Sequence, residues 1–157
     1  MPEFVFDVVR ESPLWARAPR LKTSVARIAG LLEGRASGHV SYIFSDDAMV
    51  QGLNLAWRGK DKPTNVLSFP DGDADETGIT HLGDVILAHE TVTREAEEMG
   101  IPVDDHLAHL ILHGSLHLLG YDHETEAEAQ VMENLETELL ARIGIKDPYQ
   151  SGARALD

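Results

Sequence analysis

The sequence has no cysteine among its 157 residues. Disulfide bonds and thiolate metal ligands are therefore excluded, so a transition-metal site would have to use His, Asp or Glu. The absence of cysteine also fits a reducing cytoplasm, where we expect the protein to act. Apolar runs stay below the ~18 residues of a membrane span, and the first ten residues lack the pattern of a signal peptide. We therefore expect neither a membrane partner nor a signal peptide.

Positive charge is scarce, because 13 Lys and Arg stand against 27 Asp and Glu and give a formal net charge of −14. This balance argues against a general nucleic-acid binder, since phosphate neutralisation drives such binding. The charge is uneven, however. Residues 1–62 carry nine basic and seven acidic side chains, whereas residues 63–157 carry four and twenty. One half could meet an anionic partner while the other repels it.

The length of the chain and its 43% hydrophobic residues suit one domain over residues 1–157. Alternating apolar and β-branched residues predict strands at 4–9, 39–45, 65–70 and 82–89. Apolar spacings of three and four predict helices at 21–34, 46–57, 93–100, 103–120 and 124–144, with loops at 58–64 and 71–80. This order predicts an α+β, or mixed α/β, fold with one roughly four-stranded mixed sheet packed with helices.

The most informative segment is residues 106–123, HLAHLILHGSLHLLGYDH. His113 and His117 are four residues apart, which on a helix places both imidazoles on one face, about 5–6 Å apart at Cβ. Gly120 can adopt the left-handed conformation that ends a helix, so the chain can bring His123 to the same ion. Three ligands leave one position open for water or substrate, as in catalytic zinc sites. The pattern predicts a Zn²⁺ site in a hydrolase, rather than helix-face histidines without metal.

The spacing H-x-x-x-H-x-x-G-x-x-H equals that of the metzincin zinc peptidases, so we expect a zincin-like architecture. Those peptidases carry their general base, a Glu, directly after the first histidine, where this chain has Gly114. A metalloprotease, or a zinc hydrolase acting on a small molecule, stays an alternative. His106 and His109 share the helical face, and we interpret them as solvated or satisfied in the core rather than as groups that orient a ligand.

The segment HGSLHLLGYDH (113–123) resembles the signature of the bacterial YbeY endoribonuclease family, a factor in ribosomal RNA maturation. NLAWRGKDKPTNVLSFP (54–70) is similar to the family's arginine-containing loop and following strand, and GDVILAHE (83–90) to its next strand. The resemblance covers about residues 40–143. It implies that the three histidines are zinc ligands and that Arg58 is a catalytic residue, since its permanent, forked charge suits a phosphate.

The resemblance further implies a single-strand endoribonuclease that matures the 3′ end of small-subunit ribosomal RNA and serves ribosome quality control. Its partners would be ribosomal RNA, the small ribosomal subunit and ribosome-assembly proteins. A non-catalytic assembly factor with structural zinc is an alternative, but structural zinc usually has four protein ligands. We expect the basic groups of residues 1–62 to lie on the zinc face and the acidic C-terminal helix to face away. These groups include Arg17, Arg20, Lys22, Arg27, Arg58, Lys60 and Lys62.

The sequence leaves two questions, the role of Asn65 and the identity of the general base. The family usually has Asp where this chain has Asn65, a change that keeps hydrogen bonding and loses a charge. The general base is not evident either. Asp122 and Glu90 are candidates for the base, and Asp122 or Asp84 could instead orient a zinc-bound imidazole. Each of the three also has an ordinary interpretation as a surface or capping carboxylate.

Overall fold

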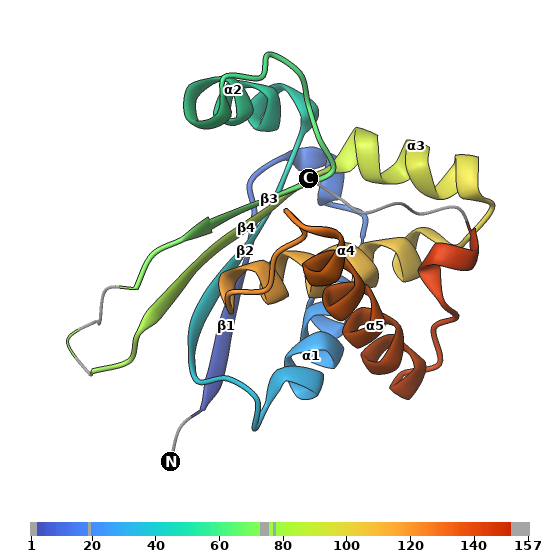
Figure 1. The fold of residues 1–157 in the computed structure, drawn as a ribbon. Helices are drawn as coiled ribbons and strands as arrows, with labels where there is room; N and C mark the ends of the chain where they lie inside the picture. Colours follow the sequence, from blue (N-terminus) through green and yellow to red (C-terminus); the bar gives the residue numbers. More distant parts are fainter. Residues whose placement is uncertain (1–2, 19, 73–75, 77, 152–157) are drawn as a thin grey trace.

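The structure is a computed structural model that describes residues 3–18, 20–72, 76 and 78–151. Its strands are β1 (Phe4–Arg10), β2 (Gly38–Ser45), β3 (Val66–Pro70) and β4 (His81–Ala88), and they form one sheet in the order β1-β2-β4-β3 (Figure 1). β2 pairs in parallel with β1 and with β4, whereas β3 runs antiparallel to β4. The predicted four-stranded mixed sheet is therefore confirmed, as is the α+β class.

In the described part of the chain, five α-helices pack around the sheet: α1 (Leu21–Leu32), α2 (Asp47–Arg58), α3 (His89–Met99), α4 (Val103–Leu118) and α5 (Glu126–Arg142). Asp46 and Thr125 cap α2 and α5 by accepting hydrogen bonds from backbone amides of the first turn. α3 begins four residues earlier than predicted, directly after β4. The described residues also include two short 3-10 helices that were not predicted, Pro13–Trp15 and Pro148–Ser151. The expected loop 71–80 joins β3 to β4, and its residues 73–75 and 77 lie outside the described part.

The helices cover the sheet unequally. α1, α4 and α5 lie on one side of it and α2 on the other (Figure 1). The larger core joins α1, α4 and α5 to the sheet, and a smaller cluster of Val50, Leu67, Ile86 and Ala88 seats α2 on the opposite face. No helix in the ranges that the structure describes is long and apolar enough to cross a membrane.

α4 packs close to β3 and β4 because it carries a glycine at the contact. A Cβ atom at Gly114 would come within 2.7 Å of Val85 Cγ1 and 3.1 Å of Ser68 Oγ. The Ser68 hydroxyl donates a hydrogen bond to the Gly114 carbonyl at 3.0 Å. The absence of a side chain thus lets the helix lie directly on the sheet, which fixes the height of its histidines above β3.

Candidate metal centre

One face of α4 carries four histidines: His106, His109, His113 and His117. The Nε2 atoms of His113 and His117 are 3.0 Å apart, so the predicted i, i+4 pair converges on one point. Burial is the main reason that the pKa of His117 falls to about 4, and the nearby His113 and His123 lower it further. The ring is therefore neutral at pH 7 and has a lone pair to offer a metal.

A turn at Gly120 brings the third histidine to this pair. Gly120 has a φ of 99°, and its amide donates to the His117 carbonyl at 3.1 Å, which closes the helix as the sequence predicts. The Asp122 side chain accepts a hydrogen bond from the His123 amide at 2.8 Å and holds the following turn. One ring nitrogen from each of His113, His117 and His123 then lies within 4.8 Å of the others.

The donor atoms of this cluster fit a metal ion. His123 Nε2 is buried and has no hydrogen-bond partner among the described residues. His113 donates from Nδ1 to the Glu136 carboxylate, so its Nε2 carries a lone pair and faces His117. Buried polar atoms without partners are costly. A cation held by three nitrogens would satisfy all of them, and three imidazoles suit zinc without selecting it over other first-row metals.

Sequence reasoning missed Glu136, which is completely buried on α5. Its carboxylate accepts hydrogen bonds from His109 Nε2 at 3.0 Å, from His113 Nδ1 at 3.1 Å and from the Tyr149 hydroxyl at 2.9 Å. Burial alone would raise the pKa of Glu136, but the bonds from His109 and His113 outweigh it and lower the pKa to about 2. The ionised carboxylate fixes the tautomer and the orientation of His113.

His106 and His109 are buried, so the solvated interpretation is wrong. Each is only partly satisfied in the core, because Nε2 bonds a glutamate whereas Nδ1 has no partner among the described residues. His109 shares Glu136 with His113 and thus belongs to the support of the cluster. His106 pairs with Glu95 at 2.9 Å, and the same carboxylate accepts a bond from Asn65 Nδ2. Asn65 is thus a buried donor that joins β3 to α3 and lies outside the cavity described next.

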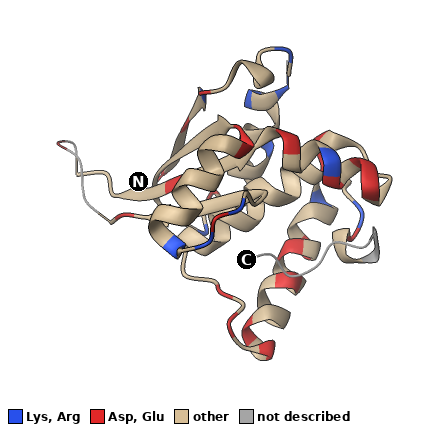
Figure 2. Ribbon diagram, turned by 90° about the horizontal axis from the view of Figure 1, so that it is seen from above, with Lys and Arg blue, Asp and Glu red and all other residues tan. Residues whose placement is uncertain are grey.

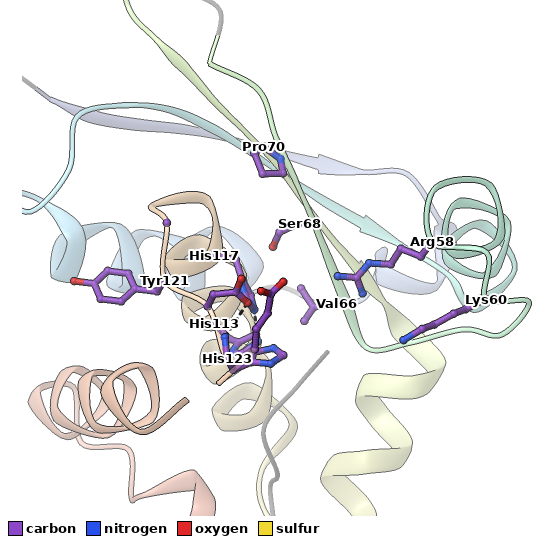
Figure 3. Close-up of a pocket in the computed structure, with 12 residues that line it drawn as sticks. Arg58, Lys60, Val66, Ser68, Pro70, His113, His117, Tyr121 and His123 are labelled. Atoms are coloured by element: carbon purple, nitrogen blue, oxygen red, sulfur yellow. Dashed lines mark hydrogen bonds between the residues drawn. The ribbon is translucent and has the colours of Figure 1, made fainter. Parts of the chain in front are cut away.

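A cavity of about 490 Å³ opens over the histidines. Arg58 and Lys60 line its wall opposite the rings, and Val66, Ser68 and Pro70 project into it from alternate positions of β3 (Figure 3). The fold therefore places the four predicted site residues, Arg58, His113, His117 and His123, around one space, although 55 residues separate Arg58 from His113 in the sequence.

Of the three carboxylates considered for the base or for orienting a ligand, Asp122 lines this cavity, and Glu90 and Asp84 do not. Glu90 accepts a hydrogen bond from the Asp47 amide at 3.0 Å, and Asp84 lies 3.4 Å from His81. Glu124, which sequence reasoning did not consider, also lines the cavity. Among the described residues, the carboxylates that line the cavity are thus Asp122 and Glu124, both in the turn between α4 and α5.

The basic side chains were expected on the face of the histidines and the acidic C-terminal helix on the opposite side, and the structure agrees only in part. Lys and Arg are few and separated, while acidic bands recur along the helices (Figure 2). Arg58 and Lys60 lie at the cavity, but Arg27 donates to the Ile143 carbonyl at the far end of α5. The expectation that the acidic C-terminal helix faces away is wrong for Glu136, which touches His113.

Comparison with known proteins gives one family. The profile described as "Endoribonuclease YbeY" matches residues 18–144, a longer stretch than the resemblance seen in the sequence, because it includes α1. A Rhizobium etli protein named "Endoribonuclease YbeY" is 57% identical over 113 residues, which are 71% of this chain and 66% of that protein. The chain thus matches about two thirds of that relative's length.

Two further relatives carry the same name. One from Rhodopseudomonas palustris strain BisB18 is 53% identical over 73% of this chain and 70% of its own length. Another from strain BisA53 is 47% identical over 89% of this chain and 84% of its own length. Among solved structures, the solution structure of TM1509 from Thermotoga maritima is 24% identical, with a TM-score of 0.45, and covers 98% of this chain and 97% of that one.

Proposed function

This chain belongs to the YbeY endoribonuclease family, and from that premise we propose that it is a zinc-dependent endoribonuclease acting on single-stranded RNA. We place it in the cytoplasm, in the maturation of the 3′ end of small-subunit ribosomal RNA and in ribosome quality control. Its partners are then the small ribosomal subunit with its RNA and the proteins of ribosome assembly. We take residues 1–157 as a single hydrolase domain.

The observation that carries the proposal is the shared cavity. Three imidazole nitrogens stand on one side of it and the permanently charged Arg58 on the other. A phosphodiester has a negative charge that an arginine neutralises in a forked geometry. The space of about 490 Å³ is open enough for a nucleotide unit to lie between the two.

In this proposal His113, His117 and His123 hold the zinc ion, which when bound supplies a Lewis acid that polarises a phosphoryl oxygen. Arg58 binds the phosphate and stabilises the charge that grows on its oxygens in the transition state. Asp122 or Glu124 accepts the proton of the attacking group. That group is water or the RNA 2′-hydroxyl, and the products tell them apart, because only the hydroxyl leaves a 2′,3′-cyclic phosphate.

The packing of α4 supports this proposal over a metalloprotease. A zinc peptidase of this spacing needs a glutamate at position 114. Here the helix lies so close to Val85 and Ser68 that even a Cβ atom would collide. The base of a peptidase is missing, and the fold leaves no room for it.

The test compares two substrates. We expect the zinc-loaded protein to cleave a single-stranded RNA from the 3′ region of small-subunit ribosomal RNA. A chelator should abolish the cleavage and added zinc restore it. A peptide library should stay intact under the same conditions. Chelator-sensitive peptide cleavage would favour the metalloprotease instead, and intact RNA in free and ribosome-bound form would favour the non-catalytic assembly factor.

A further inference from the structure

α2 presents a tryptophan to solvent close to the cavity. Trp57 is 72% exposed, more than any other large hydrophobic residue in the described ranges. Its ring stands edge-on to Phe69, with ring centroids 6.2 Å apart and an angle of 64° between the planes. Phe69 is half-buried in the smaller core cluster and so anchors the indole. Most of the indole surface is therefore exposed to solvent, while Phe69 holds the ring in place.

The register of β3 relates this pair to the site. Residues 66, 68 and 70 line the cavity, whereas Leu67 and Phe69 pack on the α2 side of the sheet. β3 is the last strand of the sheet. Trp57 and Phe69 therefore lie just across this edge strand from the histidines, and Arg58, the next residue after Trp57, is on the cavity side.

The loop after α2 adds positive charge at this edge. Arg58, Lys60 and Lys62 fall within five residues of a chain whose net charge is −14. Asn54 holds the loop, because its side chain donates to the Lys62 carbonyl at 2.9 Å and its own carbonyl accepts from the Lys60 amide at 3.3 Å. The one acidic residue in the loop, Asp61, is bonded to Gln51 at 2.9 Å.

We propose that Trp57, supported by Phe69, is a stacking platform for a base of single-stranded RNA that crosses the edge of β3 into the cavity. The proposal rests on the function proposed above and names a subsite of it. Aromatic faces that alternate with cationic side chains are how proteins hold single strands without reading sequence. Arg58 and Lys60 contact the phosphates, and the adjacent base stacks on the indole.

The two tryptophans of the chain make the test direct. Trp15 is 2% exposed and donates to the Ser45 carbonyl, so it emits from the core, whereas Trp57 emits from solvent. The zinc-loaded protein is titrated with a 2′-O-methyl single-stranded oligonucleotide, which is checked for integrity by gel. We expect the solvent-exposed emission to be quenched on binding. An oligonucleotide of the same length with abasic sites keeps the phosphates and should not quench.

Three variants complete the experiment. Trp57→Leu should weaken binding by about 5- to 150-fold, as expected for the loss of one stacked base. Leu55→Ser changes another exposed apolar residue of α2, 49% exposed, and should bind as the parent does. Trp57→Phe keeps an aromatic plane and should fall between the two.

Unchanged affinity of Trp57→Leu, or equal quenching by the abasic strand, would overturn the platform. So would an equal loss in Leu55→Ser, which would indicate a general apolar surface for a protein partner. Binding and cleavage are read separately. Quenching by the 2′-O-methyl strand without cleavage of the unmodified RNA would refute the nuclease and keep the platform. If Trp57→Leu instead cleaves the unmodified RNA at the parental rate and binds it with the parental affinity, the nuclease is kept and the platform is refuted.

Discussion

At the scale of single residues, the metal ligands give the first prediction. His117→Ala should lose zinc, because the Nε2 that faces His113 at 3.0 Å disappears and the two remaining rings stack 5.7 Å apart. Metal analysis of the purified variant measures this loss. His39→Ala, which removes a histidine paired with Asp7 on β1, is the control and should keep one zinc per chain. Full zinc content in His117→Ala would refute the assignment.

Glu136 gives a prediction that depends on packing rather than on a motif. Glu136→Gln keeps the size of the side chain but loses the charge that orients His113 and His109. We expect metal affinity to fall by about 10- to 100-fold, the usual cost of losing a partner that orients a ligand. Competition with a fluorescent chelator measures it. Glu138→Gln, an exposed residue of the same helix, should bind metal as the parent does, and a matching loss there would show that any charge change on α5 suffices.

Arg58 acts on the substrate and not on the fold. Arg58→Ala should keep its zinc and its unfolding midpoint but lose about 10²–10³-fold in cleavage rate, as when one donor to a transition-state oxygen is removed. Arg58→Lys should restore little, because a point charge does not reproduce the fork. Arg94→Ala, at an exposed arginine of α3, is the control. Parental cleavage by Arg58→Ala would remove this residue from the site.

The histidine residues were predictable and their support was not. His113, His117 and His123 share a local spacing, so a helix and a turn suffice to bring them together. Glu136 is 13 residues beyond the last of them, and its role appears only when α5 packs on α4. The one signal was a carboxylate in line with the buried Met132, Leu139 and Leu140. The role of Asn65 was likewise not predictable, because the sequence shows only that it lacks the charge of an Asp. In the fold its side chain donates a hydrogen bond to Glu95, which an Asp carboxylate would not do.

At the scale of elements, the strands and helices followed from apolar periodicity, and the contacts between them did not. α3 was placed too late because its first turn, after Ala88, has neither a side-chain cap nor an apolar stripe that separates it from β4. The proximity of Arg58 to the histidines depends on α2 leading into β3 at the edge of the sheet. A spacing of 55 residues carries no such information.

The closeness of α4 to the sheet predicts an unusual response to a small substitution. Gly114→Ala should destabilise the fold by about 1–3 kcal/mol, because the new methyl group must displace Val85 or Ser68. Gly52→Ala is the matched control. It places the same group in α2 with nothing within 4 Å, and should stabilise by about 0.5–1 kcal/mol. Urea unfolding followed by circular dichroism compares both, and an unchanged midpoint for Gly114→Ala would mean that the helix can move away.

At the scale of the whole molecule, the net charge limits how tightly the protein can bind free RNA. The net charge of −14 repels phosphates, and the basic groups at the cavity edge are few. About three phosphate contacts give a shallow salt dependence, with a slope of about −2 for single strands. We expect weak cleavage of the free strand and stronger cleavage of the same segment within a small-subunit particle, which places the RNA at the site.

The measurement is the cleavage rate of both forms across a salt series. Tight binding of the free strand with a steep salt slope would contradict this account. A particle that gives no advantage over the free strand would contradict it as well.

The strand order β1-β2-β4-β3 also determines how much of the chain must be synthesised before the metal centre can form. In the middle of the sheet β2 pairs with β4, although α2 and β3 lie between these two strands in the sequence. The sheet is therefore complete only after residue 88 has been made. Pairings of such separation are slow to form. The ligands on α4, the turn at His123 and the buried Glu136 follow later still. A nascent chain can therefore complete its metal centre only after residue 136 has been made, whereas every strand of the sheet has been made by residue 88.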